Sequence, residues 1–277
     1  MRIAVTGAGG GLGRAFLAAA SPEHEVHGFA RTDLDVRDHD AAMRALVPLE
    51  ADVILHSAAM TAVDDCEAEP ARAAETNVLG SFNVALAARR SGARLVAVST
   101  DYVFDGEKGA PYDERDRPNP LSVYGRTKLA GERAAEAAVP DALIVRTAWV
   151  FGSGKDFLSG AVRRLREGQE IGGIVDQVGS PTHVVHLAER LLPLIGSDVR
   201  GIVHLAGPEA TTWHDVLVRA RRAGGLAGEV VALKADEVGR PAPRPAYSAL
   251  TSVALGGTGV PPMPSLDDAI ERVLADV

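Results

Sequence analysis

Short apolar runs alternate with longer amphipathic segments through the first half of the chain. The apolar runs occupy residues 2–6, 25–29, 52–56, 94–99 and 142–146. Each is a continuous aliphatic stretch without polar alternation, which is typical of strands buried on both faces of a sheet. The segments between them predict helices at 12–20, 40–46, 71–90 and 121–138. Alternating strands and helices predict an α/β fold with a parallel sheet and right-handed crossovers.

The pattern is looser after residue 146. It contains one more strand at 201–206, a helix capped by Thr211 or Thr212, and a last helix from about Ser265. We therefore expect a Rossmann-like, doubly wound parallel sheet with a small C-terminal substrate-binding lobe. The dinucleotide-binding domain is expected at 1–148, completed by 176–207, and the lobe at 149–175 and 208–277.

Charge and cysteine content exclude several classes of protein. The 277 residues carry a net charge of −8, and their arginines are scattered, which argues against a nucleic-acid surface. Cys66 is the only cysteine, so no intrachain disulfide can form, as is usual in a reducing cytoplasm. No stretch approaches the roughly 20 apolar residues of a membrane span, and no secretory signal precedes the first strand. We expect a cytoplasmic protein with no membrane or nucleic-acid partner, and we leave a homodimer open.

A glycine-rich turn, "VTGAGGGLG", directly follows the first predicted strand and opens a helix. Glycines at this point let the turn tighten and let backbone N–H groups approach a diphosphate at the helix N-terminus. A glycine triplet alone is a weak signal, but its place between strand and helix strengthens it. The turn therefore predicts a dinucleotide site formed by Gly7, Gly10, Gly11, Leu12 and Gly13.

The end of the second strand bears on which dinucleotide binds. An acid at this place usually binds the ribose diol of NAD, whereas an arginine accommodates the 2′-phosphate of NADP. Here Ala30 is followed by Arg31, and the first acid is Asp33. NADPH is favoured. NADH stays open, because Arg31 could be a solvated loop residue while Asp33 turns back to the ribose.

The stretch "SVYGRTKLAGE" places Tyr124 and Lys128 one turn apart on a helix that we expect to begin at Asn119–Pro120. An ammonium about 6 Å away, at an effective dielectric near 20, favours a phenolate by about 3 kcal/mol. That energy corresponds to about 2 pK units, which would bring a phenol toward working pH. Such a tyrosine can protonate a ketone oxygen while hydride reaches the carbon. Ordinary core packing is the alternative for a tyrosine at this spacing.

A second hydroxyl follows the fourth strand, in "STDYVFDG". Ser99 and Thr100 fall at the carboxyl edge of the sheet, where α/β proteins bind their ligands. Thr100 could hold the oxygen that Tyr124 protonates. Tyr-x-x-x-Lys is common by chance, but its combination with the glycine turn and this hydroxyl, in this order, favours a reductase site.

At these motifs the chain resembles the extended short-chain dehydrogenase/reductases, and within them the dTDP-4-dehydrorhamnose reductases. The resemblance is most specific in "STDYVFDG" and "PLSVYGRTKLAGE", and extends to "HSAAMTAVDDCEAEP", "RTAWVFG" and "DQVGSPT". It implies three catalytic residues, Thr100, Tyr124 and Lys128. It implies cofactor contacts from the glycine turn, Tyr124 and Lys128, together with Arg31, Asp35, Val36, Ala58 and Ala59. It implies substrate contacts from Val63, Thr100, Asp101, Tyr102 and Trp149, although core packing is an alternative for Val63 and Trp149.

The resemblance also implies the reaction: NADPH-dependent reduction of the C4 ketone of a dTDP-4-keto-6-deoxy sugar, giving an L-rhamnose-type product. Related 4,6-dehydratases typically carry Thr-Asp-Glu, whereas this chain has Tyr102 in place of the glutamate, so reduction is favoured over elimination. His56 and Met60 depart from the family pattern, as does the C-terminal "GRPAPRPAYSAL". These departures bear on which sugar is bound rather than on which reaction is catalysed.

Two alternatives stay open. One is a reductase of another nucleotide-linked keto sugar in a secondary-metabolite pathway. The other is a non-catalytic dinucleotide-binding subunit, resembling the regulatory subunit of methionine adenosyltransferase. His183 and His186 invite a metal interpretation, but no third ligand accompanies them and we expect no metal site. Arg240 and Arg244 are interpreted as surface residues, with a diphosphate clamp as the minor alternative.

Overall fold

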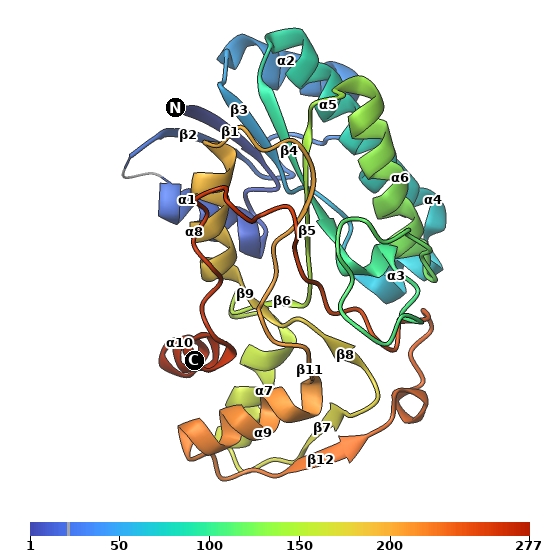
Figure 1. Cartoon of the computed structure of the whole chain (residues 1–277), viewed down its shortest axis with the longest axis vertical. Helices are drawn as coiled ribbons and strands as arrows, with labels where there is room; N and C mark the ends of the chain where they lie inside the picture. Colours follow the sequence, from blue (N-terminus) through green and yellow to red (C-terminus); the bar gives the residue numbers. More distant parts are fainter. Residues whose placement is uncertain (21–22) are drawn as a thin grey trace.

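The computed structural model describes residues 1–20 and 23–277. Its centre is a six-stranded parallel sheet in the order β10-β5-β4-β3-β1-β2 (Figure 1). The strands are β1 (Arg2–Thr6), β2 (Glu25–Phe29), β3 (Val53–His56), β4 (Arg94–Thr100), β5 (Leu143–Thr147) and β10 (Gly201–His204). This arrangement confirms the predicted doubly wound fold. The strand order reverses between β1 and β3, and α/β sheets bind ligands at the carboxyl ends of the strands beside such a reversal.

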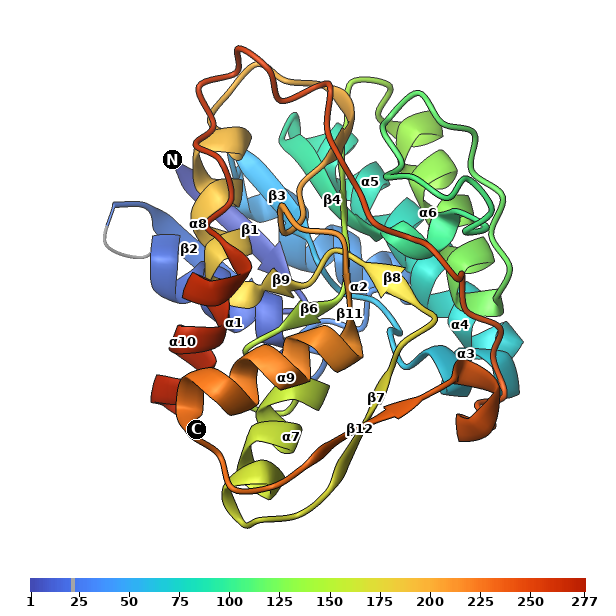
Figure 2. The ribbon, with the colours of Figure 1, turned by 60° about the horizontal axis from the view of Figure 1, so that its bottom comes forward.

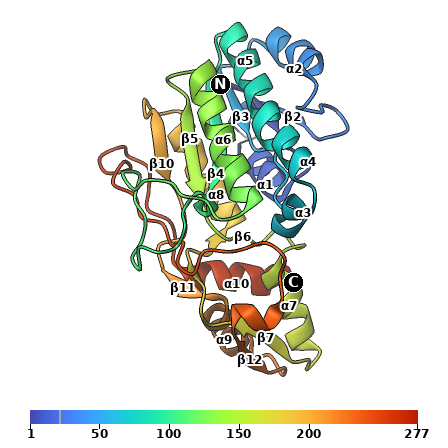
Figure 3. The ribbon, with the colours of Figure 1, turned by 90° about the vertical axis from the view of Figure 1, so that its right-hand side faces the viewer.

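Helices cover both faces of the sheet (Figure 1, Figure 3). One face carries α2 (His39–Leu46), α5 (Gly80–Ser91) and α6 (Val123–Ala138), and the other carries α1 (Gly11–Ala20) and α8 (Val184–Ile195). Alternate residues of one strand serve the two faces, so Ala4 packs on the α5 side while Ile3 and Val5 pack on the α8 side.

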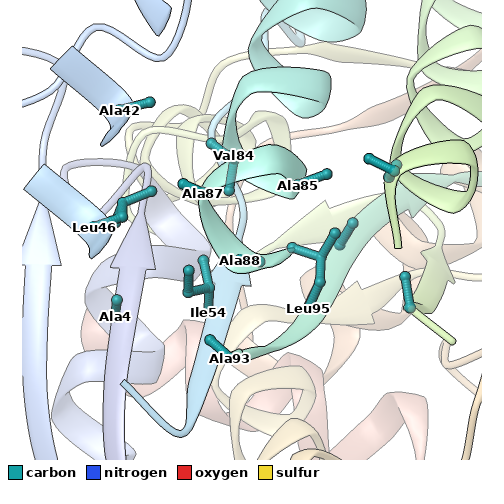
Figure 4. Close-up of a cluster of buried hydrophobic side chains, with 14 of the residues drawn as sticks. Ala4, Ala42, Leu46, Ile54, Val84, Ala85, Ala87, Ala88, Ala93 and Leu95 are labelled. Carbon is teal, nitrogen blue, oxygen red and sulfur yellow. The ribbon is translucent and has the colours of Figure 1, made fainter. Parts of the chain in front are cut away.

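The α5 face is built largely from alanine. Val84, Ala87 and Ala88 of α5 lie over Ile54 and Leu95 of the sheet (Figure 4). All five side chains are at most 1% exposed. Because alanine side chains are short, the helix backbone can lie close to the strands without leaving voids. This packing gives a structural reason for the alanines of α5.

A smaller lobe lies beyond the carboxyl edge of the sheet (Figure 2). It contains α7 (Phe157–Arg166), α9 (Trp213–Gly224), α10 (Leu266–Asp276) and the parallel pair β7 (Ile171–Ile174) and β12 (Val230–Leu233). Phe151, Leu158, Leu217 and Ile270 belong to its own apolar cluster. Two short pairs join the lobe to the rest: β6 (Val150–Phe151) with β9 (Thr182–His183), and β8 (Val178–Gly179) with β11 (Thr211–Thr212). Three short turns of 3₁₀ helix are η1 (Val47–Leu49), η3 (Asp101–Val103) and η4 (Ala235–Val238).

Residues 239–252, here called the C-terminal strap, run from the lobe back to the sheet domain (Figure 2). Arg244 forms an ion pair with Asp64 of α3 (Val63–Ala68), with 2.8 Å between Nη2 and Oδ2. The interpretation of Arg244 as a surface residue is therefore wrong, since its side chain is only 10% exposed. The backbone of the strap also bridges to Tyr112 and Val178.

The helix expected at 71–90 is interrupted. It consists of α4 (Pro70–Ala74), one π-helical turn at Glu75–Leu79 and then α5. Within this turn the Asn77 amide pairs with the backbone of Met60, accepting from its N–H at 2.8 Å and donating to its carbonyl at 3.1 Å. A tertiary contact of this kind is invisible to helical periodicity.

The structure also decides where helices α6 and α9 begin. Helix α6 does not begin at Asn119–Pro120, because the Ser122 hydroxyl caps it by accepting from Gly125 N at 3.1 Å. The cap of α9 is Thr212 rather than Thr211. Among the described residues, no helix combines the length and the apolar character needed to cross a bilayer.

A buried ion pair joins α6 to β5. Arg146 donates to both carboxylate oxygens of Glu132, at 2.9 and 2.7 Å, and the two side chains are 1% and 3% exposed. The hydroxyl of Ser99, on β4, donates to the same carboxylate. The guanidinium lies over the Phe104 ring, 5.3 Å from its centroid. Helix and strands are therefore held in register by charge as well as by packing.

We expect Arg146→Met to lower the free energy of unfolding by about 3–5 kcal/mol, because it leaves the Glu132 carboxylate buried without its counter-charge. Urea denaturation measures the change. Arg219→Met is the matched control. It breaks the exposed pair of Arg219 with Glu209 and should cost at most about 1 kcal/mol. Equal losses in the two variants would contradict a special contribution from the buried pair.

Candidate active site

Two adjoining cavities, each of about 470 Å³, lie at the carboxyl edge of the sheet beside the β1–β3 reversal. Both are lined by Gly7, Gly10 and Ala59. The first is also lined by Gly11, Leu12, Gly13, Val63, Thr100, Asp101, Tyr102, Tyr124, Lys128 and Trp149. The second is also lined by Arg31, Asp35, Val36 and Ala58. The structure thus brings every residue that the sequence placed in the site to one groove.

The glycine turn forms the floor between the two cavities. Gly7 has a φ of 76°, and a Cβ there would lie 2.6 Å from the backbone nitrogen of Ala58. A Cβ on Gly13 would likewise meet the carbonyl of Gly7. Helix α1 begins at Gly11 and has no acidic residue in its first turn. Its free N–H groups therefore suit an anionic group such as the diphosphate of a dinucleotide.

Charged side chains at the second cavity distinguish between the possible dinucleotides. Asp33 is turned to its own loop, where its carboxylate accepts from Ala30 N at 2.9 Å. Arg37 donates to Asp35 at 2.9 Å, and this hydrogen bond lowers the pKa of Asp35 to about 2. Arg31 is exposed and lines the cavity, and no hydrogen bond or ion pair within the described ranges engages its guanidinium. A free cation, rather than a free carboxylate, is therefore available to the ligand.

Lys128 and Tyr124 both line the first cavity. The Lys128 ammonium donates to the carbonyl of Val98 at 2.7 Å, and burial lowers the pKa of Lys128 to about 8. Burial also raises the pKa of Tyr124 above its ordinary value, and a hydrogen bond with Thr100 opposes the increase.

The predicted lowering of the Tyr124 pKa by Lys128 is therefore wrong for the protein alone. Charge spacing takes no account of the burial of the phenol, which raises the pKa of Tyr124. The Lys128 ammonium is also hydrogen-bonded to the carbonyl of Val98. Tyr124 consequently stays protonated near neutral pH, which suits a proton donor.

His56 lies behind this pair on β3. Its Nδ1 is 2.8 Å from the Thr6 hydroxyl and its Nε2 is 3.1 Å from the Ser81 hydroxyl. Burial lowers the pKa of His56 to about 3, with a further contribution from Lys128. The ring is thus neutral, and it serves as a buried link between β1, β3 and α5.

Aromatic side chains form the wall of the first cavity nearest the lobe. Tyr102 meets Tyr124 edge to face, with 5.8 Å between centroids. Trp149 has a left-handed backbone, φ 44°, and stacks on Trp213 of α9 at 5.0 Å. Gly179 packs against the Trp149 ring and has no space for a Cβ. Trp149 therefore packs in the lobe and also lines the cavity, and its contact with a substrate stays a prediction.

Several lining residues were not anticipated from the sequence. In the first cavity they include Ser57, Thr61, Thr147, Val150, Ser153 and Val184. Thr147 ends β5, so the rule that parallel strands present their carboxyl ends to the ligand could have identified it. Its hydroxyl is buried and has no partner in the described part of the chain. Ser153 carried no comparable signal, because only the fold brings it against Gly11.

The remaining candidates lie outside the groove. The rings of His183 and His186 are 4.9 Å apart, between centroids. Across residues 1–20 and 23–277, no group of three or more His, Cys, Asp or Glu is placed to hold a metal ion. Arg240 donates to Gln177 at 3.3 Å.

Comparisons with known proteins show which family the chain is related to. The family model described as the RmlD substrate binding domain matches residues 1–277. The chain is 40% identical to the dTDP-4-dehydrorhamnose reductase of Mycolicibacterium smegmatis, over 100% of this chain and 86% of that protein. It is 36% identical to a probable dTDP-4,6-dihydroxy-2-methyloxan-3-one 4-ketoreductase of Streptomyces antibioticus, over 100% and 96% of the two chains.

A solved structure is also closely similar. The dTDP-4-dehydrorhamnose reductase of Bacillus anthracis, crystallised in complex with NADP, superposes with a TM-score of 0.95. The two chains are 32% identical, and the match covers 100% of this chain and 99% of that one. The chain described here therefore belongs to the dTDP-4-dehydrorhamnose reductase family.

Proposed function

We propose that this protein uses NADPH to reduce the C4 ketone of a dTDP-4-keto-6-deoxy sugar, as dTDP-4-dehydrorhamnose reductases do in dTDP-L-rhamnose biosynthesis. The observation that carries the proposal is the meeting of Thr100, Tyr124 and Lys128 with the glycine turn in one groove. A cytoplasmic location goes with it, because the lone, buried Cys66 needs no oxidising compartment. A homodimer stays part of the proposal, to be tested by the mass of the protein in solution.

In this proposal each part of the cofactor has its own place along the groove. The α1 N-terminus and the glycine turn bind the diphosphate, and Arg31 binds the 2′-phosphate. Asp35 and Val36 lie beside the adenine, and Ala58 and Ala59 lie along the middle of the dinucleotide. When bound, NADPH supplies the hydride that reaches the carbonyl carbon.

The proton that the ketone oxygen receives comes from a side chain of the protein. Tyr124 is protonated and donates to the ketone oxygen as negative charge develops there. Thr100 hydrogen-bonds the same oxygen, and Lys128 holds the nicotinamide ribose and adds positive charge near the phenol. Val63, Asp101, Tyr102 and Trp149 form the wall against which the sugar binds.

The residue at position 102 bears on whether the protein reduces its substrate or eliminates water from it. Tyr102 lies 5.8 Å from Tyr124, centroid to centroid, and it takes the place that a dehydratase gives to glutamate. Burial raises the pKa of Tyr102 to about 12, so this phenol is no general base near neutral pH. Reduction without elimination is therefore the chemistry that the residues support.

The direct test is NADPH oxidation, followed by absorbance, with a panel of nucleotide-linked keto sugars. We expect the highest kcat/KM with dTDP-4-keto-6-deoxy sugars. A preference for a differently substituted 4-keto sugar would favour the secondary-metabolite alternative, which the similarity to the Streptomyces antibioticus protein supports. Cofactor binding without any turnover, together with co-purification of a larger enzyme, would favour a regulatory subunit.

We expect Tyr124→Phe to lower kcat by about 10²–10⁴-fold, because it removes the proton donor. The dissociation constant of NADPH, measured by calorimetry, should stay close to that of the wild type. Tyr112→Phe is the matched control. Tyr112 stacks on Phe104 and donates to Asp105, so its variant should keep its turnover. A wild-type rate for Tyr124→Phe would refute the assignment.

We expect Arg31→Ala to lower the ratio of kcat/KM for NADPH to that for NADH by about tenfold or more, since a charge-assisted hydrogen bond contributes about 1.5–3 kcal/mol. Steady-state kinetics with both cofactors measure the ratio. Arg89→Ala, in the last turn of α5, is the control and should leave the ratio unchanged. An unchanged ratio in Arg31→Ala would remove Arg31 from the 2′-phosphate site.

A further inference from the structure

A buried carboxylate lies directly behind the hydroxyl of Thr100. Asp101 is 2% exposed, and each of its carboxylate oxygens accepts from a hydroxyl. Thr100 Oγ1 donates to Oδ1 at 3.0 Å, and Ser248 Oγ donates to Oδ2. Ser248 belongs to the C-terminal strap, 147 residues away along the chain. The side chain therefore links the strap to the Thr100 hydroxyl of the proposed reaction centre.

The hydrogen bonds of Thr100 restrict what it can do. A threonine hydroxyl has one proton, and here that proton is directed to Asp101. The same oxygen accepts from Tyr102 N at 3.2 Å, and the hydroxyl also has a hydrogen bond with Tyr124. An ionised carboxylate only accepts, whereas a protonated one has an O–H to donate. Thr100 can direct its proton to a ketone oxygen only when Asp101 no longer needs it.

We propose that Asp101 is a positioning residue that sets the direction of the Thr100 hydroxyl, and that Ser248 of the strap sets the state of Asp101. When Asp101 is protonated it donates to Thr100, and Thr100 then donates to the ketone oxygen. When Asp101 is ionised it holds the Thr100 proton away from the substrate. This inference rests on the proposed function, because the ketone is the group that Thr100 must reach.

The surroundings of Asp101 support such a change of state. Burial raises the pKa of Asp101 to about 7, and the hydrogen bonds from Ser248 and Thr100 act in the opposite direction. The titratable groups that face it are Tyr102 on η3 and Tyr124 on α6.

Neither nearby cation pairs with Asp101. Arg244, on the strap, is directed to Asp64, and Lys128, on α6, donates to Val98. Within the described ranges no ion pair involves Asp101, so its charge is not compensated. Asp101 can therefore be neutral near physiological pH.

The test is the pH dependence of kcat in wild type, Asp101→Asn and Ser248→Ala. In the wild type, kcat should decline through the Asp101 pKa to a lower plateau, because the ionised form withholds the Thr100 proton while Tyr124 can still donate its own. An asparagine amide in the Asp101 position donates permanently to Thr100, so the kcat profile of Asp101→Asn should lose this decline, whatever the absolute turnover of the variant.

Ser248→Ala removes a hydrogen bond that favours the ionised form, so the decline should move to higher pH. Ser248→Thr keeps a hydroxyl and should restore the wild-type profile. Ser252→Ala is the matched control, since Ser252 belongs to the same strap but donates to Glu114. Its profile should match that of the wild type. Titration of Lys128 is common to all of these variants, so the differences between their profiles report Asp101.

A second readout needs neither cofactor nor substrate. In the folded protein the pKa of Asp101 is raised from 3.8 to about 7, so the native state binds more protons than the unfolded state between these values. The contribution of Asp101 to wild-type stability must then fall as pH rises through that window. The melting temperature of Asp101→Asn relative to wild type should therefore increase from about pH 4 to pH 7 and stay constant above. The same melts show whether the variant is folded.

The outcomes separate the two claims. If the wild type reduces no keto sugar, the proposed function fails and the role of Asp101 in it fails too. If the wild type is active but Asp101→Asn shows the same decline, only the inference is overturned. Ser248→Ala with the same midpoint as the wild type would overturn the inference as well, because Ser248 would then not set the protonation state of Asp101.

Discussion

The buried ion pair between Glu132 and Arg146 holds α6 at a defined position along the sheet. Tyr124, Lys128 and Glu132 follow one another at four-residue spacing, so they share one face of that helix. Because Glu132 is tied to β5 and β4, the turn that carries Lys128 lies against β4 and the turn that carries Tyr124 faces the cavity. A buried pair is costly to desolvate and tolerates little displacement, which suits it to setting register rather than to adding stability.

The same architecture explains why the groove lies where it does. The glycine turn after β1, Thr100 at the end of β4 and Thr147 at the end of β5 are all brought to one edge because the strands are parallel. The lobe and the C-terminal strap approach that edge from beyond it, so the Asp64–Arg244 pair and the Asp101–Ser248 hydrogen bond connect distant parts of the chain beside the cavity.

Sequence patterns predicted those features whose cause is local. The continuous aliphatic strands, the glycine turn and the spacing of Tyr124 and Lys128 all follow from a backbone period or from the lack of a side chain. The interruption of the helix at Asn77 was not predictable, because it depends on a contact with Met60 across the fold. The pKa of Tyr124 was misjudged for a similar reason, since charge spacing can be read from a helix but burial cannot.

The sequence by itself determined the class of the fold and the chemical groups of the site, because parallel strands bring their carboxyl ends together whatever the loops do. Only the tertiary structure decided which hydroxyl, carboxylate and guanidinium groups face each other. Ser248 and Asp101 are far apart in the chain, and no periodicity relates them. The protonation of Asp101 depends on how much water the folded chain excludes, which is a property of packing and not of residue order.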